Sequence, residues 1–191
     1  MSNHRDWEGL SRKLWPSEAP KFRDHLLRLD CESRRLRFAR SVSDDFLCDY
    51  ADRMSLMGSI IYAHQVSGTV VAAAELRKLA DQWGEEAEAA FSVERPFQNC
   101  GIGSELMGCI IRSARNRGVR RLYMSCLTEN RKMQAIARRH DALLHFERGE
   151  VFGEITPTDA SYFSMVGEAV DDRLGLMLAV FDLGRSASKA A

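Results

Sequence analysis

Residues 94–114, ERPFQNCGIGSELMGCIIRSA, decide the fold of this 191-residue chain. Every fourth position from Ile102 to Ala114 is apolar, which predicts a helix with one buried face. Gly101 and Gly103 stand at the start of this helix, although glycine costs backbone entropy and contributes no side chain to packing. The pattern therefore raises the question of what requires a bare backbone at this helix N-terminus.

Three interpretations of the two glycines compete. The first is a tight turn that lets a strand and a helix pack closely. The second is a dinucleotide-binding fingerprint, which fails because Leu106 occupies the third glycine position. The third is an anion cradle, in which successive N–H groups and the helix dipole face a phosphate or pyrophosphate. No GK[ST] follows the glycines, so a γ-phosphate site is not indicated. The first and third interpretations stay open.

Composition narrows the class of protein. Basic and acidic residues balance at 27 each, so no general attraction to nucleic acid or to an anionic membrane is expected. The five cysteines (31, 48, 100, 109 and 126) form no CxxC pair, and the histidines share no metal-ligand spacing. The N-terminus is polar, and no apolar run approaches the roughly 20 residues of a membrane span. We expect a soluble cytoplasmic protein without a metal, with neither nucleic acid nor membrane as a partner.

Strand and helix periods alternate along the chain. The sequence predicts helices over 17–29, from Ser43 to a break at 57–58, from 102 to Gly118, and beyond Thr128, whose side chain is the expected cap. Predicted strands are 59–66, 69–76, 85–93, 120–127, 142–147 and 150–156. The pattern indicates an α/β or α+β sheet with helices on both faces, in one domain over 1–183 followed by a mobile tail, 184–191.

A long amphipathic helix is predicted near the C-terminus, after Pro157 and Asp159. Its apolar positions include Phe163, Val166, Val170, Met177 and Phe181. Such a stripe either packs on the sheet of its own chain, the favoured interpretation, or forms a dimer interface. The oligomeric state expected from the sequence is therefore a monomer or a homodimer.

Several of these sequence features together resemble those of one known protein family. Val93, the segment Gln98-x-x-Gly101-Ile102-Gly103 and the helix that follows resemble the coenzyme A motif of the GNAT acyltransferase superfamily, Q/R-x-x-G-x-G/A. Asn130, near the start of a helix after the strand RLYMSCL, matches the order of that family over about residues 85–150. The segment 26–39, LLRLDCESRRLRFA, is more weakly similar to the acetyltransferase domains of bacterial protein-lysine acetyltransferases.

The resemblance implies a fold and a donor site. The implied fold is a single-domain, mixed and mostly antiparallel sheet that splays between its fourth and fifth strands, with acetyl-CoA in the gap. The backbone of Phe91, Ser92 and Val93 would pair with the pantetheine arm, and Asn130 would bond that arm or fix the loop before its helix. The amides that would hold the pyrophosphate belong to Gln98, Asn99, Cys100, Gly101, Ile102, Gly103 and Ser104.

Catalysis by such a fold requires a neutral amine, because an ammonium has no lone pair. The candidate bases are Glu88, on the third predicted long strand, and Glu75, which ends a very apolar strand. A solvated charge run and a plain strand end are the alternative interpretations of these two glutamates. The superfamily's usual tyrosine acid falls at Ala137, so water could protonate the departing thiolate. Cys126 and Ser125, at the end of the preceding strand, are alternative acids, although a buried small residue is the favoured interpretation of both.

The sequence thus predicts an N-acetyltransferase that uses acetyl-CoA and attacks the thioester directly. Its acceptor would be a small-molecule amine or a protein lysine. The alternative is a module on the same fold that senses acyl-CoA or binds a protein without turnover.

Overall fold

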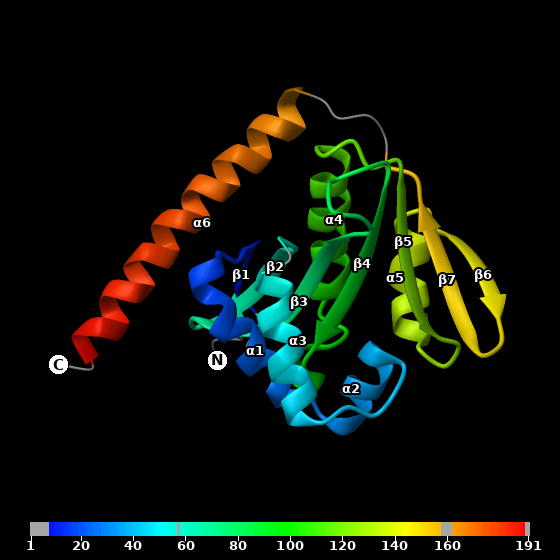
Figure 1. Cartoon of the computed structure of the whole chain (residues 1–191), viewed down its shortest axis with the longest axis horizontal. Coiled ribbons are helices and arrows are strands. Elements are labelled where there is room, and N and C mark those ends of the chain that lie inside the picture. The colour runs from blue at the N-terminus through cyan, green and yellow to red at the C-terminus, as the bar shows by residue number, and fades with distance from the viewer. Residues whose placement is uncertain (1–7, 57, 158–161, 190–191) are drawn as a thin grey trace, which may run out of the picture.

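The computed structural model describes residues 8–56, 58–157 and 162–189. Its seven-stranded sheet has the order β1-β2-β3-β4-β5-β7-β6, and only the β4–β5 pair is parallel (Figure 1). The strands are β1 (Leu10–Lys13), β2 (Ile60–Val66), β3 (Thr69–Lys78), β4 (Glu86–Val93), β5 (Arg121–Leu127), β6 (Leu143–Glu147) and β7 (Glu150–Ile155). The helices are α1 (Ala19–Arg28), α2 (Cys31–Phe38), α3 (Asp44–Leu56), α4 (Ile102–Arg115), α5 (Arg131–Arg139) and α6 (Tyr162–Lys189).

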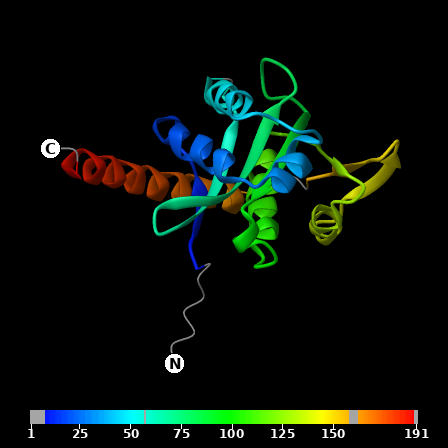
Figure 2. The ribbon, with the colours of Figure 1, turned by 90° about the horizontal axis from the view of Figure 1, so that it is seen from below.

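Helices cover both faces of the sheet, as predicted. Figure 2 shows α1, α2 and α3 on one side and α4 and α5 on the other. Along β3, alternate residues face opposite sides, so Ala72, Ala74 and Leu76 pack toward α4. Ala73 packs toward α1 and α3 instead, and Val70 lies on the same face because the β2–β3 register shifts between His64 and Gln65. This alternation produces two apolar cores, one on each face, from a strand that is apolar on both.

Two short elements were not predicted from the sequence. β1 pairs with β2 at one edge of the sheet, from Leu10 opposite Gln65 to Lys13 opposite Tyr62. α2 has no buried residue and therefore shows little apolar periodicity. Asp30 caps it by accepting a hydrogen bond from the Ser33 N–H at 3.0 Å.

The C-terminal helix corrects the sequence prediction. α6 does not bury its apolar stripe on the sheet, since Val166, Val170 and Met177 are exposed. The side chains of Phe163 and Phe181 lie outside the described residues. α6 also continues to Lys189, so the stretch predicted as a tail is helical through 189, and its mobility stays a prediction.

Candidate active site

The sheet opens between β4 and β5. The two strands pair only from Glu86 opposite Arg121 to Glu88 opposite Tyr123. Beyond this point β4 continues to pair with β3, as far as Val93 opposite Ala72. The splay predicted between the fourth and fifth strands is therefore present.

A groove of about 350 Å³ lies beside the separated part of β4. Its floor is the stretch 91–93 of β4, and the loop 97–104 closes one end. One wall is α5, with Met133 and Ile136 among its lining side chains. The other wall is α2, which contributes Ser33, Leu36 and Arg37.

Most of the predicted donor-site residues line this groove. They are Phe91, Ser92, Val93, Gln98, Asn99, Gly101, Gly103, Ser104 and Asn130. Cys100 and Ile102 do not line it. Ile102 is buried in the core under α4, and the Cys100 thiol lies 3.4 Å from the Gln98 carbonyl oxygen.

The two glycines serve different purposes. Gly101 has a φ of +87°, a conformation that side chains rarely adopt, and a Cβ built there meets no protein atom within 4 Å. A Cβ at Gly103 would lie 2.8 Å from Cδ1 of Ile136. Gly103 therefore allows close packing of α4 against α5, whereas Gly101 adopts a left-handed turn without strain and leaves space at the mouth of the groove. Each of the two interpretations left open thus fits one glycine, close packing at Gly103 and a bare backbone at Gly101, and both glycines line the groove.

The N-terminus of α4 can receive an anion. Gly101 occupies the cap position, and no side chain among the described residues caps this helix. The N–H groups of Gln98 and Ser104 donate to the carbonyls of Arg95 and Gly101, at 3.3 and 3.0 Å. The N–H groups between them lie at the positive end of the helix dipole. Lys132, from α5, adds positive charge to the same end of the groove.

Gln98 connects three elements around the groove. Its Nε2 donates to the Val93 carbonyl at 3.0 Å and lies 3.4 Å from the Ser33 hydroxyl on α2. Its Oε1 accepts from Nζ of Lys132 on α5 at 2.7 Å. The side chain of Gln98 therefore links α2, β4 and α5, the elements that line the groove.

Asn130 is the cap of α5. Its Oδ1 accepts a hydrogen bond from the Met133 N–H at 3.1 Å. The prediction that Thr128 caps this helix is wrong, because α5 begins at Arg131, and the Thr128 carbonyl accepts from Gln134 instead. Asn130 thus fixes the loop before α5, one of the two roles considered for it.

Glu75 is buried and fully bonded. Its Oε1 accepts from Nη2 of Arg37 at 2.5 Å, and its Oε2 accepts from the Tyr50 hydroxyl at 2.6 Å. Burial and the Glu75 charge both raise the pKa of Tyr50. Burial opposes the charge on Arg37, but Glu75 and Tyr50 outweigh it and raise the pKa of the guanidinium. Glu75 is therefore a buried anchor for Arg37, a groove residue that the sequence did not single out.

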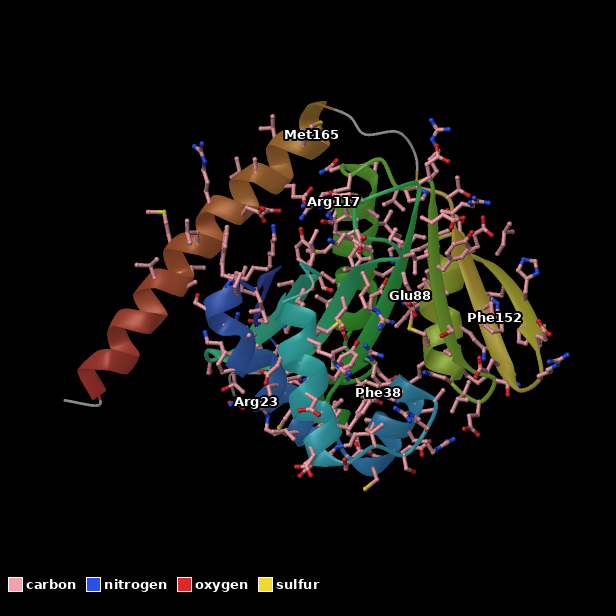
Figure 3. The ribbon with its side chains drawn as sticks, viewed as in Figure 1. Arg23, Phe38, Glu88, Arg117, Phe152 and Met165 are labelled. Atoms are coloured by element: carbon pink, nitrogen blue, oxygen red, sulfur yellow. The ribbon has the colours of Figure 1, made fainter. Side chains whose placement is uncertain are left out.

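Glu88 lies where the strands part (Figure 3). Its side chain is one-third exposed, and its Oε1 lies 2.7 Å from Nη2 of Arg77. The strand register places Glu88, Tyr123, Glu154 and Leu143 in one row across β4, β5, β7 and β6. Paired residues share a face of the sheet, so the Glu88 carboxylate belongs to the face that carries Tyr123 and Glu154.

A buried polar chain ties α1 to the groove floor. Nε2 of His25 lies 2.9 Å from the Ser92 hydroxyl, and Nδ1 lies 3.0 Å from Oε1 of Glu94. Complete burial lowers the pKa of His25, although Glu94 opposes the shift. Burial would raise the pKa of Glu94, but hydrogen bonds from His25 and Arg28 hold it below its usual value. This chain fixes the side chain of Ser92.

Comparison with known proteins now decides the family. Residues 23–141 match the model of the acetyltransferase (GNAT) family, which is more than half of the chain. The chain belongs to this family. The match includes α2, the splayed strands, the Gly101 loop and α5, and it ends before β6. The predicted resemblance is thereby confirmed.

Solved structures show the same GNAT fold. The GNAT domain of S. lividans PAT is 24% identical to this chain. The match covers 76% of this chain and 89% of that domain, with a TM-score of 0.65. The Salmonella typhimurium protein yncA, solved with its cofactor acetyl-CoA, is 15% identical to this chain. The match covers 81% of this chain and 96% of yncA, with a TM-score of 0.59. A ribosomal-protein-alanine N-acetyltransferase from Brucella melitensis is 18% identical to this chain. The match covers 77% of this chain and 99% of the Brucella protein, with a TM-score of 0.57.

The described residues do not indicate a metal site or a membrane-spanning helix. Over 8–56, 58–157 and 162–189, no group of three potential metal ligands gathers, and none of the helices is both long and apolar enough to cross a bilayer. Ala137, at the position of the superfamily's tyrosine, is buried in the core beneath α5. Ser125, expected to be buried, is exposed on β5, while Cys126 is buried and burial raises the pKa of its thiol.

Proposed function

We propose that this protein is an N-acetyltransferase that transfers the acetyl group of acetyl-CoA to a primary amine by direct attack on the thioester. One observation carries the proposal. A single groove runs from the uncapped N-terminus of α4 along residues 91–93 of β4. Glu88 lies three residues earlier on the same strand, where the β4–β5 pairing ends, and does not line the groove.

The groove fits the donor. The open space at Gly101 and the N–H groups of 99–103 suit a pyrophosphate, with Lys132 and Arg139 as countercharges. The edge of β4 from Phe91 to Val93 no longer pairs with β5, so its backbone suits the amides of an extended arm. Acetyl-CoA supplies a thioester whose thiolate, with an ordinary thiol pKa of about 8.5, leaves without a dedicated acid.

Three carboxylates lie around Tyr123 at the splay, those of Glu86, Glu88 and Glu154, and the Tyr123 hydroxyl lies 3.1 Å from Oε1 of Glu86. Two of them are paired, Glu86 with Arg121 and Glu88 with Arg77. A cationic amine would be drawn to these carboxylates in competition with the two arginines. We assign Glu88 the removal of the amine proton, because it is partly exposed, whereas both oxygens of Glu75 are bonded in the interior.

A small-molecule amine and a protein amine both suit this surface. The Brucella melitensis neighbour, named for a ribosomal-protein substrate, lends support to a protein acceptor.

Binding of the donor is tested by calorimetry with acetyl-CoA. Gly101→Val should abolish binding, since it both strains the turn and fills the mouth of the groove. Gly84→Val is the matched control, because Gly84 has an ordinary φ and open space around it. Unchanged binding by Gly101→Val, or no binding by the unmodified protein, contradicts the proposal.

Turnover is tested by release of free CoA over a panel of primary amines and lysine peptides. Glu88→Gln should lower kcat about 10²- to 10⁴-fold, the usual contribution of a positioned base. Glu85→Gln, at an exposed carboxylate on the preceding turn, should change little. Binding of acetyl-CoA without CoA release across the panel would favour the second candidate, an acyl-CoA sensor, which the alanine at position 137 motivates.

A further inference from the structure

Two serines that line the groove each pair with a histidine. Ser92 belongs to the floor of the groove, and its hydroxyl lies 2.9 Å from Nε2 of His25 on α1. Ser104, in the first turn of α4, belongs to the closed end, and its hydroxyl lies 3.0 Å from Nε2 of His140, directly after α5. A hydroxyl can donate or accept, so the other partners of each imidazole decide which it does.

The surroundings of His25 make Ser92 the donor in its pair. Nδ1 of His25 lies 3.0 Å from Oε1 of Glu94. Arg28 donates to the same oxygen, at 3.0 and 3.1 Å, and the pKa of Glu94 stays below its usual value, so this carboxylate is ionised and only accepts. Nδ1 of His25 therefore carries a hydrogen. Complete burial lowers the pKa of His25 and keeps the ring neutral, so Nε2 has a lone pair that accepts the Ser92 O–H.

The surroundings of His140 give the second pair the opposite direction. Nε2 of His140 also lies 3.1 Å from the main-chain carbonyl oxygen of Ser104. A carbonyl oxygen only accepts, so this Nε2 carries a hydrogen, and the Ser104 hydroxyl accepts from the same N–H. The O–H of Ser104 is thus left to donate to a ligand, whereas at Ser92 the lone pairs of the oxygen are left to accept.

The Ser92 side chain faces the α2 side of the groove. Phe91 and Val93 pack on the core beneath α4, so Ser92 between them points to the other face of the sheet, where α1 and α2 lie (Figure 2). α2 is the groove wall on that face, with Leu36 and Arg37 among its lining residues. The Ser92 oxygen therefore lies between the histidine of α1 and the space that a ligand would fill.

The lone pairs of the Ser92 oxygen are not used within the protein. No described residue donates a hydrogen bond to it. Two amide oxygens of the groove differ in this respect, because Oε1 of Gln98 accepts from Lys132 and Oδ1 of Asn130 accepts from the Met133 N–H. An acceptor held in one orientation and without a donor suits a ligand that brings an N–H group.

Acetyl-CoA has the complementary groups in the same order. Its pyrophosphate oxygens accept hydrogen bonds, and the amides of its pantetheine arm carry N–H groups that donate. The O–H of Ser104 lies at the N-terminus of α4, beside the main-chain N–H groups that suit the pyrophosphate. The oxygen of Ser92 lies in the stretch 91–93, along which the arm would run.

We propose that His25 and His140 are positioning residues that set two serine hydroxyls of the groove in opposite directions, Ser104 to donate to the pyrophosphate and Ser92 to accept from a pantetheine N–H. Neither histidine lines the groove, so each acts only through its serine. This inference rests on the proposed occupation of the groove by acetyl-CoA.

Calorimetry with two probes separates the two serines. The probes are acetyl-CoA and 3′-phospho-ADP, the nucleotide half of CoA, which has the pyrophosphate but no amide. Ser92→Ala should weaken binding of acetyl-CoA about 3- to 10-fold, the usual net value of one hydrogen bond, and should leave 3′-phospho-ADP unaffected. Ser104→Ala should weaken binding of both probes. Ser11→Ala is the matched control, because the Ser11 hydroxyl lies 2.8 Å from Nδ1 of His64 outside the groove, and it should weaken neither.

The outcomes distinguish this inference from the proposed function. If the unmodified protein binds acetyl-CoA and Ser92→Ala binds both probes equally well or loses both, the inference is overturned and the acetyltransferase proposal stands. If the unmodified protein does not bind acetyl-CoA, both are overturned.

Nitrogen NMR of the imidazole rings tests the positioning directly. At about pH 8, where histidine is ordinarily neutral, His25 should be the Nδ1–H tautomer and His140 the Nε2–H tautomer. The same tautomer at both residues would overturn the proposal.

A double-mutant cycle tests whether His25 acts through Ser92. His25→Leu should weaken acetyl-CoA binding in the unmodified protein but not in Ser92→Ala, because the hydroxyl that it orients is already absent. Circular dichroism confirms that each variant is folded. An equal loss in both backgrounds would mean that His25 acts on the groove by another route, and would overturn its positioning role.

Discussion

α4 and α6 face the protein in opposite ways. α4 buries Leu106, Met107 and Ile110 completely, and its exposed positions are polar or charged. α6 buries Glu168 and leaves Met177 exposed. Both helices carry an apolar stripe of similar spacing, yet only one stripe meets the core.

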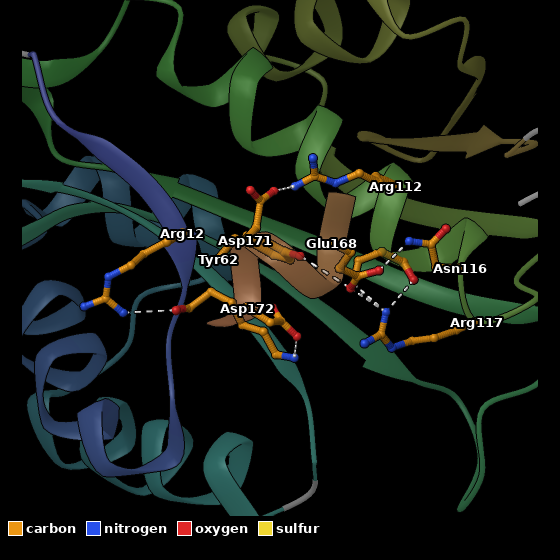
Figure 4. Close-up of polar contacts among 10 residues, drawn as sticks. Arg12, Tyr62, Arg112, Asn116, Arg117, Glu168, Asp171 and Asp172 are labelled. Carbon is orange, nitrogen blue, oxygen red and sulfur yellow. Dashed lines mark hydrogen bonds and ion pairs between the residues drawn. The ribbon is translucent and has the colours of Figure 1, made fainter. Parts of the chain in front are cut away.

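The difference shows what periodicity does and does not determine. Spacing tells which residues share a face, and the neighbouring surface decides which face turns inward. α4 lies over the apolar side of β3. α6 lies over Lys13, Arg112 and Arg117, each of which pairs with a carboxylate of this helix (Figure 4).

The largest expected effect compares one substitution on both helices. Leu106→Ala should lower the free energy of unfolding by about 2–5 kcal/mol, because Leu106 is fully buried and truncation leaves a cavity. Leu176→Ala, at an exposed position of α6, should change it by no more than about 0.5 kcal/mol. Urea denaturation measures both. Equal losses for the two variants would show that α6 is packed like α4, contrary to the structure.

The next largest effect concerns the inward side of α6. Glu168→Ala should cost about 3 kcal/mol, since it leaves Arg117, Ser113 and Asn116 without their buried acceptor. Unfolding followed by circular dichroism measures the loss. Asp171→Ala, which removes a more exposed pair with Arg112, is the control and should cost about 1 kcal/mol or less. A negligible loss for Glu168→Ala would mean that other contacts hold α6.

Much of the fold was predictable because its signals are local. The periodicities of β2 to β5 and of α4 are strong, and the hydrogen bonds of each element follow from them. The donor loop was predictable for the same reason, since the segment from Gln98 to Gly103 carries its own motif. The use of Gly103 for packing was not, because Ile136 comes from a different helix.

The remaining features depend on contacts between distant segments. Arg37 is held in the wall of the groove by its contact with Glu75, which lies 38 residues later in the sequence. Nothing in the sequence near Arg37 predicts that pairing. The signal that could have found α2 is the segment 26–39, where Asp30 followed by Ser33 resembles a helix start. The orientation of α6 depends on its ion pairs with Arg117 and Lys13. Because both residues belong to other segments, the periodicity of α6 alone could not predict that orientation.

A smaller effect separates the two glycines of the donor loop. Gly103→Ala should cost no more than about 1 kcal/mol, because the contact is with the end of the Ile136 side chain, which lines the groove and can turn away, and Ile136→Val should remove the cost by deleting the Cδ1 methyl. Gly101→Ala should cost about 1–2 kcal/mol through its φ of +87°, and Ile136→Val should not relieve it. Thermal unfolding of the single and double variants measures both. Equal rescue of the two alanine variants would contradict the assignment.

The smallest effect is a pH dependence that compares the buried polar groups of α1 and α6. The pKa of His25 is lowered in the folded protein, so below pH 6.5 the unfolded chain binds a proton that the folded chain does not. Its contribution is complete above pH 6.5 and is lost as the pH falls, by at most about 1.4 kcal/mol per pH unit. Burial opposes the charge of Glu168, but its hydrogen bonds hold its pKa below 4.5, so its contribution is lost only in stronger acid.

His25→Gln should therefore flatten the stability profile just below pH 6.5, and Glu168→Gln should change only the part below pH 4.5. Urea denaturation at a series of pH values measures both profiles. If His25→Gln keeps the unmodified slope between pH 6.5 and 4.5, then folding does not shift the pKa of His25. If the loss of stability in acid becomes steeper, then the folded protein holds the His25 proton, and the α1 contact with Glu94 is an ion pair like those that hold α6.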